Sequence, residues 1–313
     1  MKEKNHKGLP WFGIPKLIPY LRGYGRLFLS MVLFGLLASG MDVVIPLFQQ
    51  YAINHFIADS TMQGIWPFVA LYLLVMAVQT ASNYISAYGA CKAELYIGRD
   101  LRREAFDHVQ TLSFSYFNQN SVGYIHARVI SDTDRIAGTL AWGIMEGVWE
   151  IAYLLFAIVM MFALNWKLAL CVMVIVPILV VSSIFFQKKL VFYHRKVREH
   201  NSQITSAFNE GITGAKTTKT LVIEDKVEKE FDQLTGEMKR VSVRAMHFRS
   251  VFMSTTAFAA SIALAIVLWR GGIITREGVM LVGTLSVFMN YAQGMMEPIQ
   301  WLVQVLSSLV NVQ

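Results

Sequence analysis

The stretch LALCVMVIVPILVVSSIFFQ, residues 168–187, contains no charged side chain. A helix rises 1.5 Å per residue, so about 20 apolar residues are enough to cross the hydrocarbon core of a bilayer. Inside lipid, every backbone N–H and C=O group must be bonded within the protein, which favours a helix over a loop. We therefore expect a membrane-spanning helix over residues 166–187.

The composition of the whole chain agrees with a membrane protein. The 313 residues are 55% hydrophobic and only 16% charged, and the mean hydropathy is +0.45. A soluble chain of this size needs far more polar surface to cover its core. Five further segments are apolar enough to span, so we predict an all-α membrane protein with six spans, at residues 27–53, 64–91, 138–164, 166–187, 250–270 and 279–310.

The basic residues indicate the orientation of these spans. Of the 28 Lys and Arg residues, 25 lie in residues 1–26 or in the two long connectors, 92–135 and 188–249. The other connectors are short and carry only Lys167, Arg270 and Arg276. Cytoplasmic segments are enriched in Lys and Arg, so we expect both termini and both long connectors to be cytoplasmic, with the chain in the cell membrane.

Both long connectors have the periodicity of amphipathic helices. In the first, apolar residues recur every three to four positions, and the second repeats this spacing; the residues are Ile97, Leu101, Ala105, Val109 and Leu112, then Ile204, Phe208 and Ile212. Neither connector contains proline. We expect each to form a helical hairpin that continues the spans into the cytoplasm. Residues 8–25 predict a short amphipathic elbow helix on the inner membrane surface, with a flexible basic tail as the alternative.

A resemblance to a known family rests on the connectors. The first contains FNQNSVGYIHAR, residues 117–128, followed by SDTDRI, residues 131–136. An aromatic residue followed by Gly, Arg and Asp at this spacing is similar to the first coupling segment of ABC exporters. The second connector resembles the other coupling segment, and the last span carries a matching Glu297-Pro298 pair. The chain thus resembles the transmembrane domain of an ABC exporter over essentially its whole length.

The resemblance implies that the hairpin tips couple the membrane domain to a nucleotide-binding domain. The residues that match are Phe117, Asn118, Gly123, Arg128, Asp132, Glu210, Gly214 and Lys216. Ser115 and residues 118–121 are cap and turn formers suited to a reversal of the chain, and Gly123 permits a tight turn or a close backbone approach. We expect Arg128, Asp132, Asp134 and Arg135 to pair between neighbouring helices and stiffen the hairpin, the alternative being that they only solvate a helix face.

The resemblance also implies partners and a cofactor outside these residues. It predicts a domain-swapped dimer with a second half-transporter, identical or similar, and a nucleotide-binding domain that uses ATP and Mg. Residues 211–218 resemble a P-loop, but Ala215 and Glu210 occupy its two glycine positions, so this chain is not expected to hydrolyse ATP. We expect the ATPase domain to follow on the same polypeptide, the alternative being a separate chain.

Polar residues inside the spans are candidates for a substrate pathway. An ionisable side chain at bilayer depth costs at least about 2.5 kcal/mol, so it usually faces a cavity or a partner. The candidates are Asp42, Glu146, Glu150, Asn290, Gln293, Met296, Glu297, Gln300 and Trp301. Glu297, Gln300 and Gln304 follow helical spacing, with Gln293 one turn earlier on the same face. An acidic lining would favour cationic amphipaths; the alternative is hydrogen bonding between helices. The seven scattered histidines show no metal-ligand spacing.

These observations predict an ATP-driven exporter half that moves amphipathic drug-like or lipid-like molecules out of the cytoplasm or inner leaflet by alternating access. One alternative is a secondary carrier or channel, which would favour broken spans at matching places in two halves. Another is a membrane scaffold whose hairpins bind a cytosolic partner.

Overall fold

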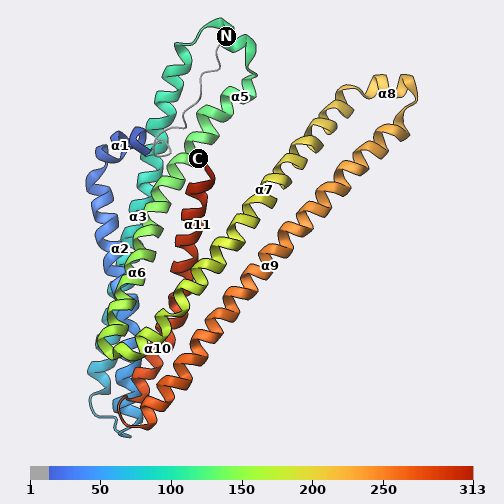
Figure 1. Cartoon of the computed structure of the whole chain (residues 1–313). Coiled ribbons are helices and arrows are strands. Elements are labelled where there is room, and N and C mark those ends of the chain that lie inside the picture. Colours follow the sequence, from blue (N-terminus) through green and yellow to red (C-terminus); the bar gives the residue numbers. More distant parts are fainter. Residues whose placement is uncertain (1–13, 313) are drawn as a thin grey trace. The chain divides into compact units, whose positions relative to one another are not determined.

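A computed structural model describes residues 14–312, with side chains placed for residues 18–305. The described residues are helical throughout apart from short turns (Figure 1). They form two compact units. The first comprises the residues up to Cys171 together with Ile266–Pro298, and the second comprises Val172–Ala265 together with the residues from Ile299 onward. Each unit is described by itself.

Among the described residues, five helices are long and apolar enough to cross a membrane. They are Gly25–Ile57, Ile65–Gln110, Val122–Met173, Ile175–Thr213 and Glu224–Arg276. The five apolar helices confirm a multi-pass, all-α membrane protein. The predicted sixth span, residues 279–310, is occupied by two helices that Met295 alone separates, α10 (Val282–Gly294) and α11 (Met296–Val312), and it stays a prediction.

The boundary between the third and fourth predicted spans lies at Asn165. This residue is within α6 (Thr133–Met173) but has a non-helical backbone, with φ −160° and ψ 102°. Its side-chain oxygen accepts a hydrogen bond from the backbone N–H of Leu168 at 3.1 Å. An asparagine that bonds the third N–H of the following helix is an N-cap, so α6 contains two helices that meet at the expected turn.

Two prolines account for two further helix breaks. A one-residue turn interrupts the helices at Val174, just before α7 (Ile175–Thr213), and at Met295, between α10 and α11, although both residues keep right-handed helical backbone angles. Proline follows three residues later in both cases, at Pro177 and Pro298. Proline has no N–H to donate to the carbonyl four residues before it, so a helix that continues through these points would lose that hydrogen bond.

In the first unit, α2 (Gly25–Tyr51) packs against α3 (Ile65–Gln110), and α3 packs against α6 through small residues. A buried cluster joins Ala93 and Ile97 of α3 to Ala137 and Ala141 of α6. Small side chains let two helix backbones approach closely, as they do in membrane proteins generally. The expected first hairpin is therefore present, with α3 and α6 as its two arms.

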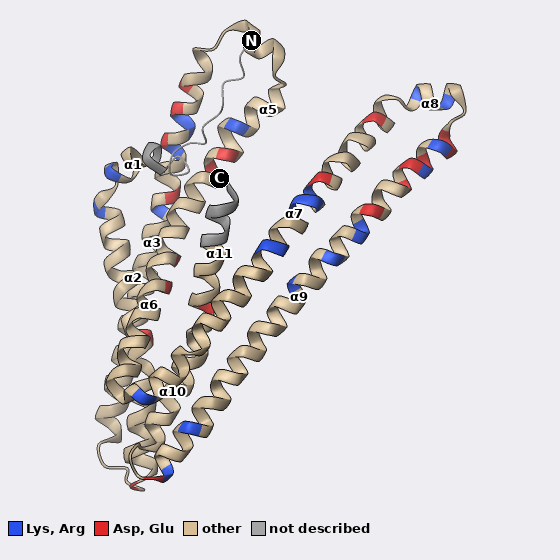
Figure 2. Ribbon diagram, in the orientation of Figure 1, with Lys and Arg blue, Asp and Glu red and all other residues tan. Residues whose placement is uncertain are grey.

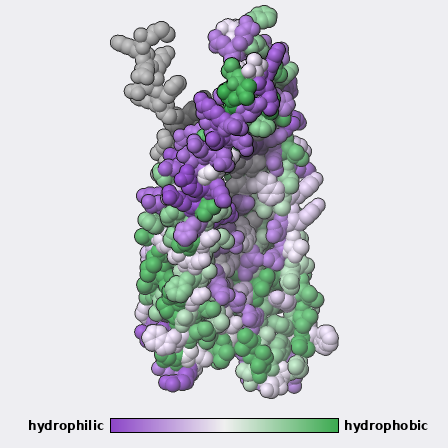
Figure 3. Space-filling model, turned by 90° about the vertical axis from the view of Figure 1, so that its right-hand side faces the viewer, coloured by the Kyte–Doolittle hydropathy of each residue, from purple (hydrophilic) through white to green (hydrophobic). Residues whose placement is uncertain are grey.

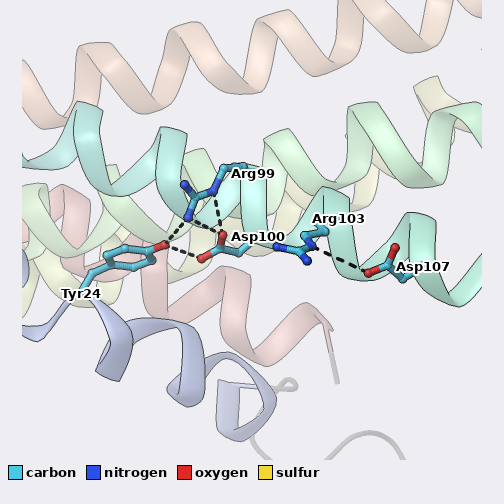
Figure 4. A network of polar contacts seen from close by, with 5 residues as sticks. All are labelled: Tyr24, Arg99, Asp100, Arg103 and Asp107. Atoms are coloured by element: carbon cyan, nitrogen blue, oxygen red, sulfur yellow. Dashed lines mark hydrogen bonds and ion pairs between the residues drawn. The ribbon is translucent and has the colours of Figure 1, made fainter.

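The elbow helix α1 (Ile14–Gly23) is attached to this hairpin by tyrosines. The Tyr20 hydroxyl donates to the carboxylate of Glu104, and the Tyr24 hydroxyl donates to that of Asp100. Arg99 donates to the Tyr24 oxygen at 3.0 Å and to Asp100 at 2.8 Å (Figure 4). The hydrogen bond from Tyr24 and the neighbouring guanidinium groups lower the pKa of Asp100. Residues 8–13 of the predicted elbow lie outside the described part of the chain, as do residues 1–7 before it.

The second unit is built on a long antiparallel hairpin of α7 and α9 (Glu224–Arg276). Tyr193 stacks on Phe248 with ring centroids 5.0 Å apart, and Phe186 contacts Phe252 at 5.6 Å. Sequence numbers rise on one helix as they fall on the other, which is the register of an antiparallel pair. The predicted second hairpin is thus confirmed as helical.

Charged residues are unevenly distributed along both hairpins. In each unit they gather toward the end that carries the hairpin tip, near α5 (Val122–His126) in the first and α8 (Ala215–Leu221) in the second (Figure 2). The face drawn in Figure 3 likewise has hydrophilic atoms toward one end and mostly hydrophobic atoms toward the other. This division is typical of helices that leave a membrane and continue into water.

Candidate functional site

Asp42 on α2 holds three helices together. Its carboxylate accepts a hydrogen bond from Gln79 on α3, and one from the indole N–H of Trp149 on α6 at 2.9 Å. Both oxygens therefore have a partner on another helix. This geometry favours the interhelical reading of Asp42 over the predicted place in a substrate pathway, because a satisfied carboxylate offers little to a passing molecule.

Glu150 on α6 differs from Asp42 in its hydrogen bonding. Its side chain is only 6% exposed, and its Oε2 atom is buried without a hydrogen-bond partner among the described residues. Glu146, one turn earlier on the same helix, is exposed, and so is Glu297 at the start of α11. Both act electrostatically on Glu150. The structure thus brings these three predicted pathway residues into one group within the first unit.

A close contact between α6 and α10 lies next to this group of carboxylates. A Cβ atom on Gly294 would collide with the hydroxyl of Tyr153, so glycine is needed for the helices to approach here. The two helices run antiparallel, and Glu150 and Glu297 each lie one turn to the same side of the contact. Trp149 stacks on Tyr153 with ring centroids 5.8 Å apart, which adds an aromatic wall beside Glu150.

Asn290 belongs to a series of polar contacts between α2 and α10. Its amide donates to Gln49 at 2.9 Å and to the carbonyl of Ser286 at 3.0 Å. Three more contacts extend the series: Gln50 to Thr284, Gly283 to Asn54 and Tyr291 to the carbonyl of Val43. Sequence reasoning missed all of these α2 partners. The polar residues in an otherwise apolar α2 were a usable signal, since buried polar groups in a membrane seek each other.

The remaining predicted pathway residues are distributed along α10 and α11. Gln293 is exposed on α10, while Met296 is 7% exposed and therefore buried. The one-residue turn at Met295 lies between Gln293 and Glu297, and the shared face expected for these two residues stays a prediction. Gln300 and Trp301 are half-buried on α11 in the second unit.

The first hairpin tip consists of α4 (Phe114–Gln119) and α5. Phe117 and Asn118 are exposed on α4, and two more apolar side chains, Phe114 and Val122, are 87% and 84% exposed. Ser121 caps α5 by accepting a hydrogen bond from the N–H of Tyr124 at 3.2 Å, as its type predicts. A short helix with bare aromatic rings at the end of a long charged hairpin is suited to bind another protein.

Gly123 does not have the role expected for it. It lies inside α5 without a positive φ angle, and a Cβ atom there would meet nothing within 4 Å. The tight turn expected at Gly123 was therefore wrong, while a close approach of a partner to its backbone stays a prediction. The turn is made instead by the extended backbone at Asn120 and Ser121.

Ion pairs stiffen the arm that follows the tip. Asp132, in the π-helix η3 (Ala127–Asp132), binds Arg128 and Arg135 at 2.8 Å each. Asp134 pairs with Arg102 across the two arms, from α6 to α3. The predicted pairing between neighbouring helices is confirmed for Asp134 and was wrong for Arg128, Asp132 and Arg135. Only the Arg102 pair bridges two helices, while the Asp132 pairs are local.

The second tip is α8, which lies between Gly214 and Val222. Gly214 ends α7, and a Cβ atom there would lie 2.9 Å from the carbonyl oxygen of Glu210. Lys216 is exposed on α8, and Lys219 binds Glu224 at 2.8 Å, which lowers the pKa of Glu224. Leu221 and Val222 are 61% and 81% exposed. Like the first tip, this one presents apolar side chains at the end of a charged hairpin.

The described residues contain no group of three or more His, Cys, Asp or Glu side chains that could hold a metal ion. The carboxylate group on α6 and α11 is therefore not arranged as a metal centre. What it offers is negative charge and one free acceptor atom in a low-dielectric surrounding.

Comparison with known proteins matches most of the chain to one family. The family described as "ABC transporter transmembrane region" matches residues 27–299. An ABC transporter ATP-binding protein of Streptococcus pneumoniae, provisionally named exp8, is 24% identical over 304 residues, which cover 96% of this chain and 51% of that protein. The provisionally named multidrug export ATP-binding/permease protein YgaD of Bacillus subtilis is 22% identical over 302 residues, covering 95% and 52%.

A Staphylococcus aureus relative, also provisionally named as a multidrug export ATP-binding/permease protein, is 24% identical over 293 residues, covering 91% of this chain and 50% of that protein. The chain spans about half the length of the curated relatives it matches. The resemblance expected from the connectors is confirmed by the family match, and the apolar helices agree with it. This chain belongs to the ABC transporter transmembrane region family.

Proposed function

We propose that this chain is the transmembrane half of an ATP-driven exporter that moves amphipathic drug-like or lipid-like molecules out of the cytoplasm or inner leaflet by alternating access. ATP binding in nucleotide-binding domains would close those domains and open outward a transport cavity that the two half-transporters of the proposed dimer enclose. Hydrolysis and product release would reset it. The names of the relatives, which include ATP binding and multidrug export, support this assignment.

The observation that carries the proposal is the exposed first tip. Phe114 and Phe117 stand on a short helix at the end of a long hairpin, far along the chain from any apolar span. A single exposed ring such as Phe106 needs no partner, but several exposed apolar side chains at one tip, here Phe114, Phe117 and Val122, are typical of a protein-binding surface. The proposed partner is a nucleotide-binding domain that uses ATP and Mg, gripped by the tip residues Phe117, Asn118, Gly123, Arg128 and Asp132.

The second tip would grip a nucleotide-binding domain in the same way, with Glu210, Gly214 and Lys216 beside its exposed apolar residues. In the proposed dimer this domain belongs to a second half-transporter. The α7–α9 hairpin forms contacts mainly within its own unit, which suits a hairpin that reaches across to a partner. Lys and Arg residues gathered near both tips support cytoplasmic tips and termini in the cell membrane.

Stiff arms are required for this coupling. The packed α3–α6 pair, the cross-arm ion pair of Arg102 with Asp134 and the tyrosines of the elbow would resist bending. Motion at the tip would then reach the spans. We place the substrate pathway along the carboxylate group of α6 and α11 and the polar residues near it, with Asp42 and Asn290 as interhelical ties at its edge.

The test compares two exposed phenylalanines in the full-length protein. Phe117→Ala removes a ring at the tip, and Phe106→Ala removes one from the shaft of α3, where the side chain is 54% exposed. ATP-driven uptake of a fluorescent amphipath into inside-out vesicles should fall at least about tenfold for Phe117→Ala and stay near wild type for Phe106→Ala, because only the tip ring transmits force. Uptake without ATP, or equal uptake by both variants, would contradict the proposal.

A further inference from the structure

Glu150 is a carboxylate that its own protein leaves unsatisfied. The side chain is 94% shielded from solvent, and Oε2 has no hydrogen-bond donor among the described residues. An unpaired buried acceptor is expensive, and an unpaired buried charge more so. Asp42 on α2 shows that this fold does supply donors to a carboxylate at membrane depth, which makes the bare oxygen of Glu150 the exception.

The surroundings of Glu150 are acidic from more than one helix. Glu146 lies one turn away on α6, and Glu297 approaches from α11 next to the contact between Tyr153 and Gly294. Glu297 lies in the first turn of α11, where the helix dipole favours a negative charge. The ion pairs that join described residues include none of these three acids. The group therefore holds an excess of negative charge that the described part of the chain does not balance.

A charged amine provides what this group lacks. An ammonium group brings one positive charge and N–H donors, and a hydrogen bond between ammonium and carboxylate is among the strongest in proteins. The indole of Trp149, the residue before Glu150, stacks on the ring of Tyr153, and these rings would offer aromatic surface to the apolar part of the same molecule. A quaternary ammonium supplies the charge but no N–H for Oε2.

We propose that Glu150 recognises a protonated amine on the amphipath that the protein transports, with Glu146 and Glu297 attracting the cation toward it. This inference rests on the proposed function, because it names the substrate class of the same pathway. It assigns one atom, Oε2 of Glu150, as the acceptor that distinguishes an amine from a neutral molecule of equal size.

The first experiment measures binding without ATP, in the full chain reconstituted into lipid nanodiscs. The probes are a dansyl-labelled long-chain alkylamine and its N-acetylated form, which differ in the charge on one nitrogen. The amine should bind at least about tenfold more tightly than the acetylated probe. Glu150→Gln should remove this preference and Glu150→Asp should keep most of it. Glu277→Gln, which removes an exposed carboxylate from the turn after α9, should leave it unchanged.

Equal binding of the two probes by the wild-type protein, or a preference that survives Glu150→Gln, would overturn the inference. A trimethylated probe tests the inference on the wild-type protein alone. It should bind more weakly than the amine, and equal binding would show that no N–H is recognised. ATP-driven uptake separates the two proposals. ATP-driven uptake of both probes at equal rates would reject amine recognition and support the exporter proposal. Selective binding without ATP-driven uptake would support amine recognition and reject the exporter proposal.

Discussion

The hydroxyl of Tyr291 donates a hydrogen bond to the backbone carbonyl of Val43 at 2.5 Å, and the Tyr291 side chain is fully buried. This hydrogen bond joins α10 to α2 at a point where both residues are buried. The neighbouring contacts of Gln50 with Thr284 and of Asn54 with Gly283 continue the tie toward the turn between the first two spans. The first half of the sixth predicted span is thus fixed to the first span by polar groups.

Tyr291→Phe should lower the free energy of unfolding by about 1 kcal/mol, because it removes one donor while Val43 keeps its place in α2. Thermal unfolding in detergent or nanodiscs would measure the change. The matched control is Tyr84→Phe, whose side chain is 69% exposed and should have almost no effect. Equal destabilisation by both changes would show that the Val43 bond contributes nothing specific.

Gly283→Ala should destabilise the protein by about 1–3 kcal/mol, because the added Cβ atom would press against the Gln50 carbonyl and the Asn54 side chain. Gly272→Ala is the matched control, since a Cβ atom there meets nothing within 4 Å. That change should be neutral or stabilise the helix by up to about 1 kcal/mol. The prediction fails if unfolding of the two variants cannot be told apart.

Tyr20 should titrate later than a free tyrosine. Burial, and then the hydrogen bond and charge of Glu104, raise its pKa from 10.0 to about 12. A raised folded-state pKa means that the contact contributes its full stability below pH 10 and loses it as the pH rises toward about 12. Tyrosinate absorbance, compared with that of Tyr20→Phe, would follow this one group.

Glu104→Gln should lower the pKa of Tyr20 only partly, because burial is the larger cause and remains. A full return to the ordinary value would mean that the carboxylate, not burial, dominates. Ionisation of Tyr20 would weaken the attachment of α1 to α3. In the Glu104→Gln variant, a fluorescent label on α1 should therefore report this loss of attachment at a lower pH than in the wild-type protein.

Val222 is a β-branched residue in the left-handed region, with φ 52° and ψ 48°. Glycine adopts this conformation without strain, so Val222→Gly should stabilise the second tip by roughly 0.5–1 kcal/mol. Hydrogen exchange of the α8 amides would slow accordingly. The adjacent change Leu221→Gly lies in the helix and should speed exchange instead; slower exchange in both variants would argue against strain at Val222.

Some features of this protein follow from local sequence. The first five spans and both hairpins could be predicted from the sequence. A run of apolar residues, or a period of three to four residues, can be recognised in one segment without knowing what that segment packs against. Ser121 as a cap and Asn165 at the turn between spans were equally readable, since each acts on the backbone within three residues of itself.

Other features were misjudged where a local rule met a wider context. Gly123 was assigned a special backbone role, yet it occupies an ordinary helix with open space around it. Within the predicted sixth span, the sequence analysis did not expect the turn at Met295, where Pro298 removes a hydrogen bond three residues later.

The sequence alone determined that the chain enters lipid repeatedly and that it carries two charged helical hairpins. Only the tertiary structure decided which intramembrane polar groups find partners: Asp42 and Asn290 are bonded, while Glu150 is left with a bare oxygen. The physical reason is that hydropathy and periodicity are properties of one segment, whereas hydrogen bonding depends on which faces of different helices meet.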